Sequence, residues 1–213
     1  MFGELKISYY SIILSLILNE HIDKMSKTIL ISQLGSIVKA TRENRLRVSN
    51  TVVNNKALFL PILELVFACD DKISIKAASV LEYVCMEKLN WMIPHLDYFC
   101  ENIHRVQFDS AIRPVAKICE LLAKAYSSKK GPDLSAEIKE YHIARIIEVG
   151  FDWLIGTQKV AAKAYTMEML FLFGKKRDWI HEELKLIIEQ NISKESAAYK
   201  ARGKKILDWI NKK

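Results

Sequence analysis

The sequence has 213 residues, half of them apolar and 27% charged, with a formal net charge of +7. This composition is typical of a globular chain and excludes a disordered or collagen-like one. Glycine (7 residues) and proline (4 residues) are scarce. Because strands need turn residues between them, this scarcity favours an all-α fold.

The charge is unevenly distributed along the chain. Residues 49–120 carry seven Lys and Arg against nine Asp and Glu, whereas residues 196–213 carry six against one. A basic terminal segment can contact phosphate or an acidic protein, and it can also serve solubility alone.

The first expected element, residues 1–24, is an N-terminal helical extension or capping helix. It contains a 12-residue apolar run, ISYYSIILSLIL at 7–18. The run is too short to span a bilayer, so we expect no membrane span. Three interpretations are open: a helix packed on the domain, a secretory signal, or an extension before a natural start at Met25. The signal is least favoured because no small-residue cleavage site follows.

Residues 25–213 are predicted to form one repeat domain of about five helix pairs. Apolar residues recur in it at intervals of three and four, which is the helical period. The first pair is expected at 25–40 and 42–54, and the first helices of later pairs at 58–69, 90–104, 142–155 and 178–191. The polar stretch 127–140 is predicted to be an inserted loop.

The second helices of the pairs share a signature in which a small residue follows an apolar one by four positions. The pairs are Ile75/Ser79, Ile112/Ala116, Val160/Ala164 and Tyr199/Gly203. Residues i and i+4 share a helix face, so the small residue lets a neighbouring helix approach closely. The residues expected to cap these helices are Asp71, Asp109, Thr157 and Ser196.

Two prolines recur in the first helices in similar surroundings. LPILE contains Pro61 and IPHLD contains Pro94, 33 residues later. Proline is tolerated in a first turn or at a bend, because elsewhere it removes a backbone hydrogen bond. Pro114, near the start of a second helix, is interpreted in the same way.

The apolar-Pro-x-Leu-acid first helix and the second helices "DKISIKAAS" and "DSAIRPVA" resemble HEAT repeats. The resemblance covers roughly residues 25–213 and implies an α-α superhelix, a solenoid of stacked helix pairs. In "DSAIRPVAKICE", "FDWLI", "DWIHEELK" and "SAAYKARGKK" the chain also resembles a family of short bacteroidetal proteins labelled adenylosuccinate lyase. The loop Gly-Ser-Ser-x-Met-Pro-x-Lys-x-Asn of true lyases has no counterpart here, so no catalytic residue is carried over.

Motifs for nucleotide binding or metalloprotease chemistry are absent from the sequence. The cysteines, at 69, 85, 100 and 119, form no CxxC pair and are expected to be reduced and buried, as in a cytoplasmic protein. His95, His104 and His142 are expected to be surface or packing residues. We therefore expect no cofactor, no metal site and no catalytic residue.

Basic residues recur on the second helices and form the candidate binding site, which we call the basic ladder. It consists of Lys76, Arg113, Lys117, Lys163, Lys200 and Lys204. Two uses of the ladder are open: contact with a partner, or pairing with acids of neighbouring repeats such as Asp71, Asp109 and Glu120.

Three Asp-Trp pairs end at Trp153, Trp179 and Trp209, and each Trp is expected in the core with its Asp in solvent.

The sequence favours a non-catalytic scaffold whose curved surface binds another protein through an acidic segment. Nucleic-acid binding of the HEAT-like DNA alkylation-repair type is the alternative, because a ladder of cations can follow a phosphate backbone. A third possibility, adenylosuccinate lyase, rests on the family resemblance alone.

Overall fold

The structure is a computed structural model that describes the backbone of residues 2–70, 72–128 and 132–212. Side chains are described for the same residues except 2–16, 19, 132 and 133. Every regular element in this part of the chain is a helix, which confirms the all-α prediction. The elements are α1 (Phe2–Gly35), α2 (Arg42–Val53), η1 (Lys56–Leu58), α3 (Phe59–Phe67), α4 (Ile73–Lys88), η2 (Leu89–His95), α5 (Leu96–Asn102), η3 (Ile103–Arg105), α6 (Asp109–Ser127), α7 (Pro132–Glu137), α8 (Glu140–Ile155), α9 (Val160–Gly174), α10 (Asp178–Asn191) and α11 (Ala197–Asn211).

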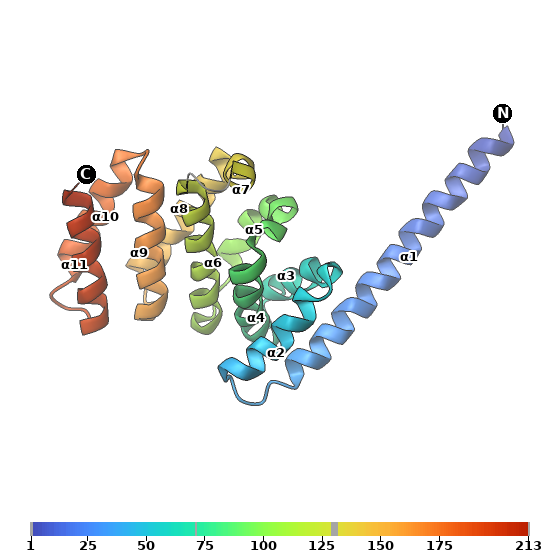
Figure 1. Ribbon diagram of the computed structural model, residues 1–213, viewed down its shortest axis with the longest axis horizontal. Helices are drawn as coiled ribbons and strands as arrows, with labels where there is room; N and C mark the ends of the chain where they lie inside the picture. Colours follow the sequence, from blue (N-terminus) through green and yellow to red (C-terminus); the bar gives the residue numbers. More distant parts are fainter. Residues whose placement is uncertain (1, 71, 129–131, 213) are drawn as a thin grey trace.

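Five helices form a row in which each one contacts the next: α2, α4, α6, α9 and α11. Figure 1 shows α4, α6, α9 and α11 standing side by side. The remaining long helices lie against this row: α3 contacts α4, α8 contacts α9, and α10 contacts both α9 and α11. The helices that carry the apolar/small signature are therefore neighbours in space.

The row is held together by apolar side chains at helical spacing. Leu81, Ile118, Met167 and Ile206, from α4, α6, α9 and α11 respectively, are fully buried. The small residues differ more among themselves. Ala116 is fully buried, and a Cβ added to Gly203 would lie 2.9 Å from Ile188 Cγ2 on α10, whereas Ala164 is partly exposed. A larger side chain is thus excluded at Ala116 and Gly203 but not at Ala164.

The prolines affect the first helices unequally. Pro61 is the third residue of α3, so its missing N–H lies in the first turn, where no partner is needed. Pro94 lies in the 3-10 helix η2, and the expected single helix at 90–104 is divided into η2, α5 and η3. Pro114 is buried inside α6, which continues beyond it to Ser127.

The predicted inserted loop at 127–140 contains a short helix, α7. Leu134 and Ile138 are buried, so apolar contacts hold this segment against the domain. Residues 129–131 of the predicted loop lie outside the described residues.

Only one of the predicted helix caps forms as expected. The Ser196 hydroxyl accepts a hydrogen bond from the Tyr199 N–H at the start of α11. Asp71 lies outside the described residues, and at α4 the carboxylate of Asp70 accepts from the N–H groups of Lys72 and Ile73. At α6 and α9 no side chain caps the helix, because Asp109 is already the first helical residue and Thr157 precedes α9 by three positions.

The C-terminal part of α1 is anchored to α3 and α4. Leu30 and Leu34 are fully buried, and Lys27 Nζ lies 2.7 Å from the Glu64 carboxylate of α3. The helix runs without a break through residues 24 and 25. None of the helices in the described chain has the length and apolar character needed to cross a membrane.

A chain that starts at Met25 is expected to remain folded, because it keeps Leu30, Leu34 and the Lys27–Glu64 ion pair. We expect its melting temperature, followed by circular dichroism, to fall by less than about 5 °C. An insoluble or unfolded product would show that the domain depends on residues 1–24.

Replacing Ala116 with Leu should overpack the fully buried joint around α6 and destabilise the fold by about 1–3 kcal/mol. Ala164→Leu is the matched control: since this position is partly exposed, it should cost less than about 1 kcal/mol. Urea unfolding measures both. Equal losses would show that the two positions are packed alike.

Candidate functional site

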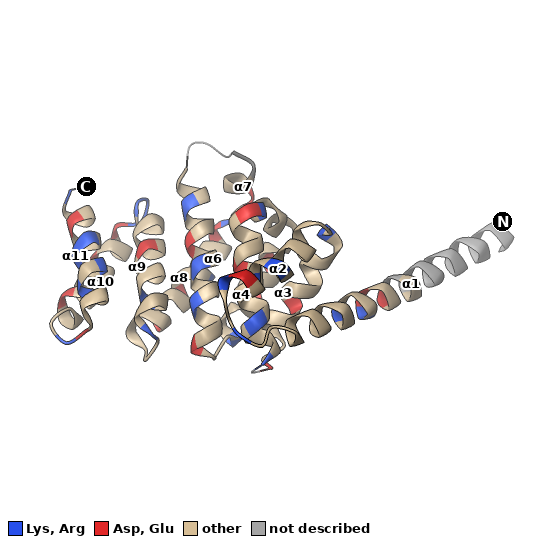
Figure 2. Ribbon diagram, turned by 60° about the horizontal axis from the view of Figure 1, so that its bottom comes forward, with Lys and Arg blue, Asp and Glu red and all other residues tan. Residues whose placement is uncertain are grey.

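The basic ladder lies along the row of helices, with Lys76 on α4, Arg113 and Lys117 on α6, Lys163 on α9, and Lys200 and Lys204 on α11. Figure 2 shows Lys and Arg alternating with Asp and Glu along these helices. Whether a ladder cation is available to a partner depends on whether a carboxylate of the protein lies within ion-pair distance of it.

Arg113 makes a two-pronged ion pair with Glu82 on the neighbouring helix α4. Arg113 Nη1 lies 3.0 Å from Glu82 Oε1, and Nη2 donates to the second oxygen. Glu82 is 6% exposed. A buried carboxylate needs a cation to offset its lost hydration, and Arg supplies the parallel donors that suit it. Arg113 therefore joins α6 to α4.

Lys117 and Lys163 are also engaged within the protein. Lys117 Nζ lies 2.8 Å from Glu120 and 4.8 Å from the ring centre of Tyr165 on α9. Lys163 is 8% exposed and lies 2.9 Å from Glu195, in the connection before α11. Glu120 is thus a partner, but of Lys117 on its own helix α6 rather than of a neighbouring repeat, and Asp109 forms no ion pair within the described chain.

Sequence reasoning missed the carboxylate that links the most helices. Glu168 on α9 accepts from Lys124 on α6, at 2.9 Å, and from Arg202 on α11. Burial alone raises the pKa of Glu168, but the hydrogen bond and charge of Lys124, together with Arg202, outweigh it and hold the pKa below its ordinary value. Helical spacing alone does not show which charged residues of different helices will meet.

The ladder cations without an ion pair in the described chain are Lys76, Lys200 and Lys204. Lys76 and Lys200 are partly buried and Lys204 is exposed. They lie near the two ends of the row, on α4 and α11. The six predicted residues thus lie on one row of helices, but three of them are paired with carboxylates of the protein and three are not.

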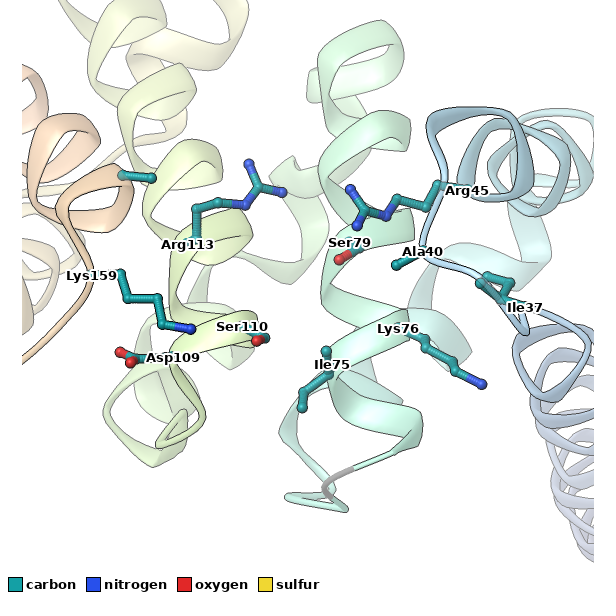
Figure 3. Close-up of a pocket in the computed structure, with 11 residues that line it drawn as sticks. Ile37, Ala40, Arg45, Ile75, Lys76, Ser79, Asp109, Ser110, Arg113 and Lys159 are labelled. Atoms are coloured by element: carbon teal, nitrogen blue, oxygen red, sulfur yellow. The ribbon is translucent and has the colours of Figure 1, made fainter. Parts of the chain in front are cut away.

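A pocket of about 270 Å³ lies at the N-terminal ends of α4, α6 and α9, beside the connection from α1 to α2. Its cations come from four segments: Arg45 (α2), Lys76 (α4), Arg113 (α6) and Lys159 (before α9). In Figure 3, Arg45 extends toward Ser79 and Lys159 toward Ser110, while Lys76 turns outward toward Ile37. Arg45 and Lys159 belong to this site but not to the predicted ladder.

The histidines do not form a reactive cluster. His142 is buried, and its Nδ1 accepts a hydrogen bond from the Lys139 N–H. Its Nε2 therefore carries the ring proton and donates to the Asp97 carboxylate at 2.7 Å. His95 stacks on Phe59, and burial together with Lys56 lowers the pKa of His95. His104 is exposed. His142 and His95 hold helices together, which agrees with the expectation that they are packing residues.

The cysteines differ from the expectation at one position. Cys85, Cys100 and Cys119 are buried, and burial raises the pKa of the Cys100 thiol to about 12 and those of the other two well above the ordinary value. Cys69 is exposed, with φ of 60°, at the end of α3. Within the described ranges no group of three or more His, Cys, Asp or Glu side chains is arranged to hold a metal ion.

The three tryptophans of the Asp-Trp pairs are not equivalent. Trp153 is buried, as expected, and Trp209 is partly buried against Phe171 at 5.1 Å between ring centres. Trp179 is 55% exposed and tilts toward Phe151 in a shallow groove between α8 and α10. The expectation that all three lie in the core is wrong for Trp179.

Replacing Glu168 with Gln should remove the shared partner of Lys124 and Arg202. We expect this to destabilise the fold by about 1–3 kcal/mol, a loss between those measured for breaking exposed ion pairs and buried ion pairs. Because the lowered pKa of Glu168 gives stability that is lost as pH falls, the variant should also lose less stability between pH 7 and pH 3 than the parent. Urea unfolding across this pH range measures both effects.

The matched control is Glu189→Gln, which removes an exposed carboxylate 4.0 Å from Lys185. It should change the stability by less than about 0.5 kcal/mol. Similar losses in the two variants would contradict a joining role for Glu168.

Comparison with known proteins found no matching family model, no matching curated protein and no matching solved structure. The function of this chain is therefore inferred from its own row of helices, ion pairs and pocket.

Proposed function

We propose that this protein is a non-catalytic scaffold, a HEAT-like α-solenoid of about five helix pairs whose row of second helices binds another protein. The partner contributes an acidic segment that lies across the row. Lys76, Lys200 and Lys204 contact its carboxylates. We place the protein in the cytoplasm, consistent with its free thiols.

The observation that carries the proposal is the division of the basic ladder. Three of its cations are joined to carboxylates of the protein itself, by Arg113–Glu82, Lys117–Glu120 and Lys163–Glu195. The pair Arg113–Glu82 joins α6 to α4, and Lys163–Glu195 joins α9 to the segment before α11, which suits a rigid binding surface. The remaining cations can form new ion pairs with a partner without first breaking existing ones.

The same division favours a protein partner over a nucleic acid. A protein that follows a phosphate backbone gains affinity from each cation that neutralises a phosphate and releases counterions. Cations already neutralised by a carboxylate at 2.8–3.0 Å contribute little to such release. An acidic protein segment needs only a few cations, because apolar contacts supply much of its binding energy.

The proposal is tested by using the full chain to capture proteins from an extract of the native host at low salt. We expect specific proteins with an acidic segment to be retained and then lost by the variant Lys76→Glu/Lys200→Glu/Lys204→Glu. The control, Lys56→Glu/Arg145→Glu/Lys185→Glu, makes the same charge change on η1, α8 and α10 and should retain them.

Two results would contradict the scaffold proposal. Retention of duplex DNA that is strong at low salt and weakens in the ladder variant, but not in the control, would favour nucleic-acid binding. Release of fumarate from adenylosuccinate, followed by absorbance, would support the lyase resemblance instead.

A further inference from the structure

The pocket at the N-terminal ends of α4, α6 and α9 contains more positive charge than the protein itself neutralises. Arg113 is matched by Glu82, which leaves Arg45, Lys76 and Lys159 against a single lining carboxylate, Asp109. None of these four side chains forms an ion pair in the described chain. The pocket therefore has an excess of two positive charges, three cations minus one acid.

Uncapped helix ends add to this positive potential. Ser110 of α6 and Ala161 of α9 lie in first turns that no side chain caps, and both residues line the pocket. The backbone N–H groups of Ser110 and Ala161 have no hydrogen-bond partner in the described chain, whereas those of Ala111 and Ala162 donate to the Phe108 and Lys159 carbonyls. The helix dipole places partial positive charge at such a helix end. Each of the two helices thus contributes to the pocket lining one residue whose N–H group has no partner in the described chain.

The hydroxyl group of Ser79 also lines the pocket. Ser79 is 7% exposed, it lies on the lining, and no hydrogen bond of its hydroxyl is found in the described chain. In Figure 3 this hydroxyl lies between α4 and α6, below the guanidinium of Arg45. The Ser79 hydroxyl is therefore available to donate a hydrogen bond to an acceptor bound in the pocket.

We propose that this pocket binds the phosphoryl group of a phosphorylated serine or threonine carried by the partner protein. A phosphoryl group carries close to two negative charges at neutral pH and has three acceptor oxygens, which match the charge excess and the several donors. A carboxylate has one charge and would leave part of the excess unmatched. Ile37, Ile75 and Ala161 give the pocket apolar walls for the neighbouring residues of the segment.

The position of the pocket selects a peptide rather than a nucleic acid. It lies at the helix ends, whereas the cations farther along α6 and α9 are held by Glu120, Glu168 and Glu195. One isolated site can hold a single phosphoryl group, but the row offers no continuous series of free cations for successive phosphates. The inference rests on the proposed scaffold function and assigns the chemistry of one contact within it.

The test is an NMR titration of the ¹⁵N-labelled full chain with the capped peptide Ala-Ala-phosphoserine-Ala-Ala. We expect concentration-dependent shifts of the Ser79, Ser110 and Ala161 amide signals, with the Ser peptide producing none. A Glu peptide should bind at least about tenfold more weakly. Equal binding of the Glu peptide, or no shifts up to about 10 mM phosphopeptide, would overturn the proposal.

Two double variants with equal loss of charge locate the site. Arg45→Gln/Lys159→Gln should weaken phosphopeptide binding at least about tenfold. Lys56→Gln/Lys185→Gln removes the same two charges on η1 and α10, outside the pocket lining and the ladder, and should leave this binding unchanged. Thermal melting shows whether each variant is folded. If Arg45→Gln/Lys159→Gln is unstable, Ser79→Ala replaces it in the test: this variant keeps all the cations and should also weaken phosphopeptide binding. If both double variants weaken binding equally, only the net charge of the protein matters, and the proposal that the phosphoryl group binds in this pocket is wrong.

Further probes separate the sources of phosphate. Inorganic phosphate that binds as tightly as the phosphopeptide, or duplex DNA that shifts these amides at lower concentration, would overturn a phosphoprotein partner. Failure of the phosphopeptide while the ladder variant still loses captured proteins would remove only this inference. Loss of the scaffold function would instead be seen in the capture experiment, whatever happens at the pocket.

Discussion

The arrangement of this molecule depends on carboxylates that are buried between neighbouring helices. Glu82 is 6% exposed and Glu120 is 2% exposed. A carboxylate removed from water to this extent is strongly unfavourable unless a cation and hydrogen bonds offset the lost hydration. Arg113 satisfies Glu82, and Lys117 and Lys124 satisfy Glu120. Cations on this surface are therefore first a structural requirement, and only those left over can serve recognition.

Helical periodicity and the small residues predicted the helices and their neighbours well. Packing of apolar residues at intervals of three and four is a local property of the sequence, which explains why α10 begins and ends at the predicted residues 178 and 191. The expected helix at 90–104 was less accurate, because Pro94 interrupts the α-helical hydrogen bonds and leaves η2, α5 and η3. Residues within the segment itself therefore explain both the accurate bounds of α10 and the division of the helix expected at 90–104.

The site was predictable only in part, because it depends on which side chains meet across helices. The sequence identified Lys76 and Arg113, which line the pocket, but not Arg45 or Lys159, which come from segments outside the repeat signature. Glu168, which joins α6 to both α9 and α11, has no local signal that separates it from an exposed glutamate. Trp179 and Cys69 were expected to be buried by residue type alone, whereas their positions at the surface are set by the neighbouring helices.

The missing caps connect the fold to the pocket. A helix start is ordinarily satisfied by a Ser, Thr, Asp or Asn side chain, as Ser196 does for α11. Asp109 and Thr157 occupy the right regions of the sequence but do not cap α6 and α9. The N–H groups of Ser110 and Ala161 therefore remain without a partner in the described chain, on the pocket lining to which Arg45 and Lys159 also belong. Side-chain caps there would have satisfied these N–H groups within the protein. Because α6 and α9 have no such caps, an external anion in the pocket can accept hydrogen bonds from them.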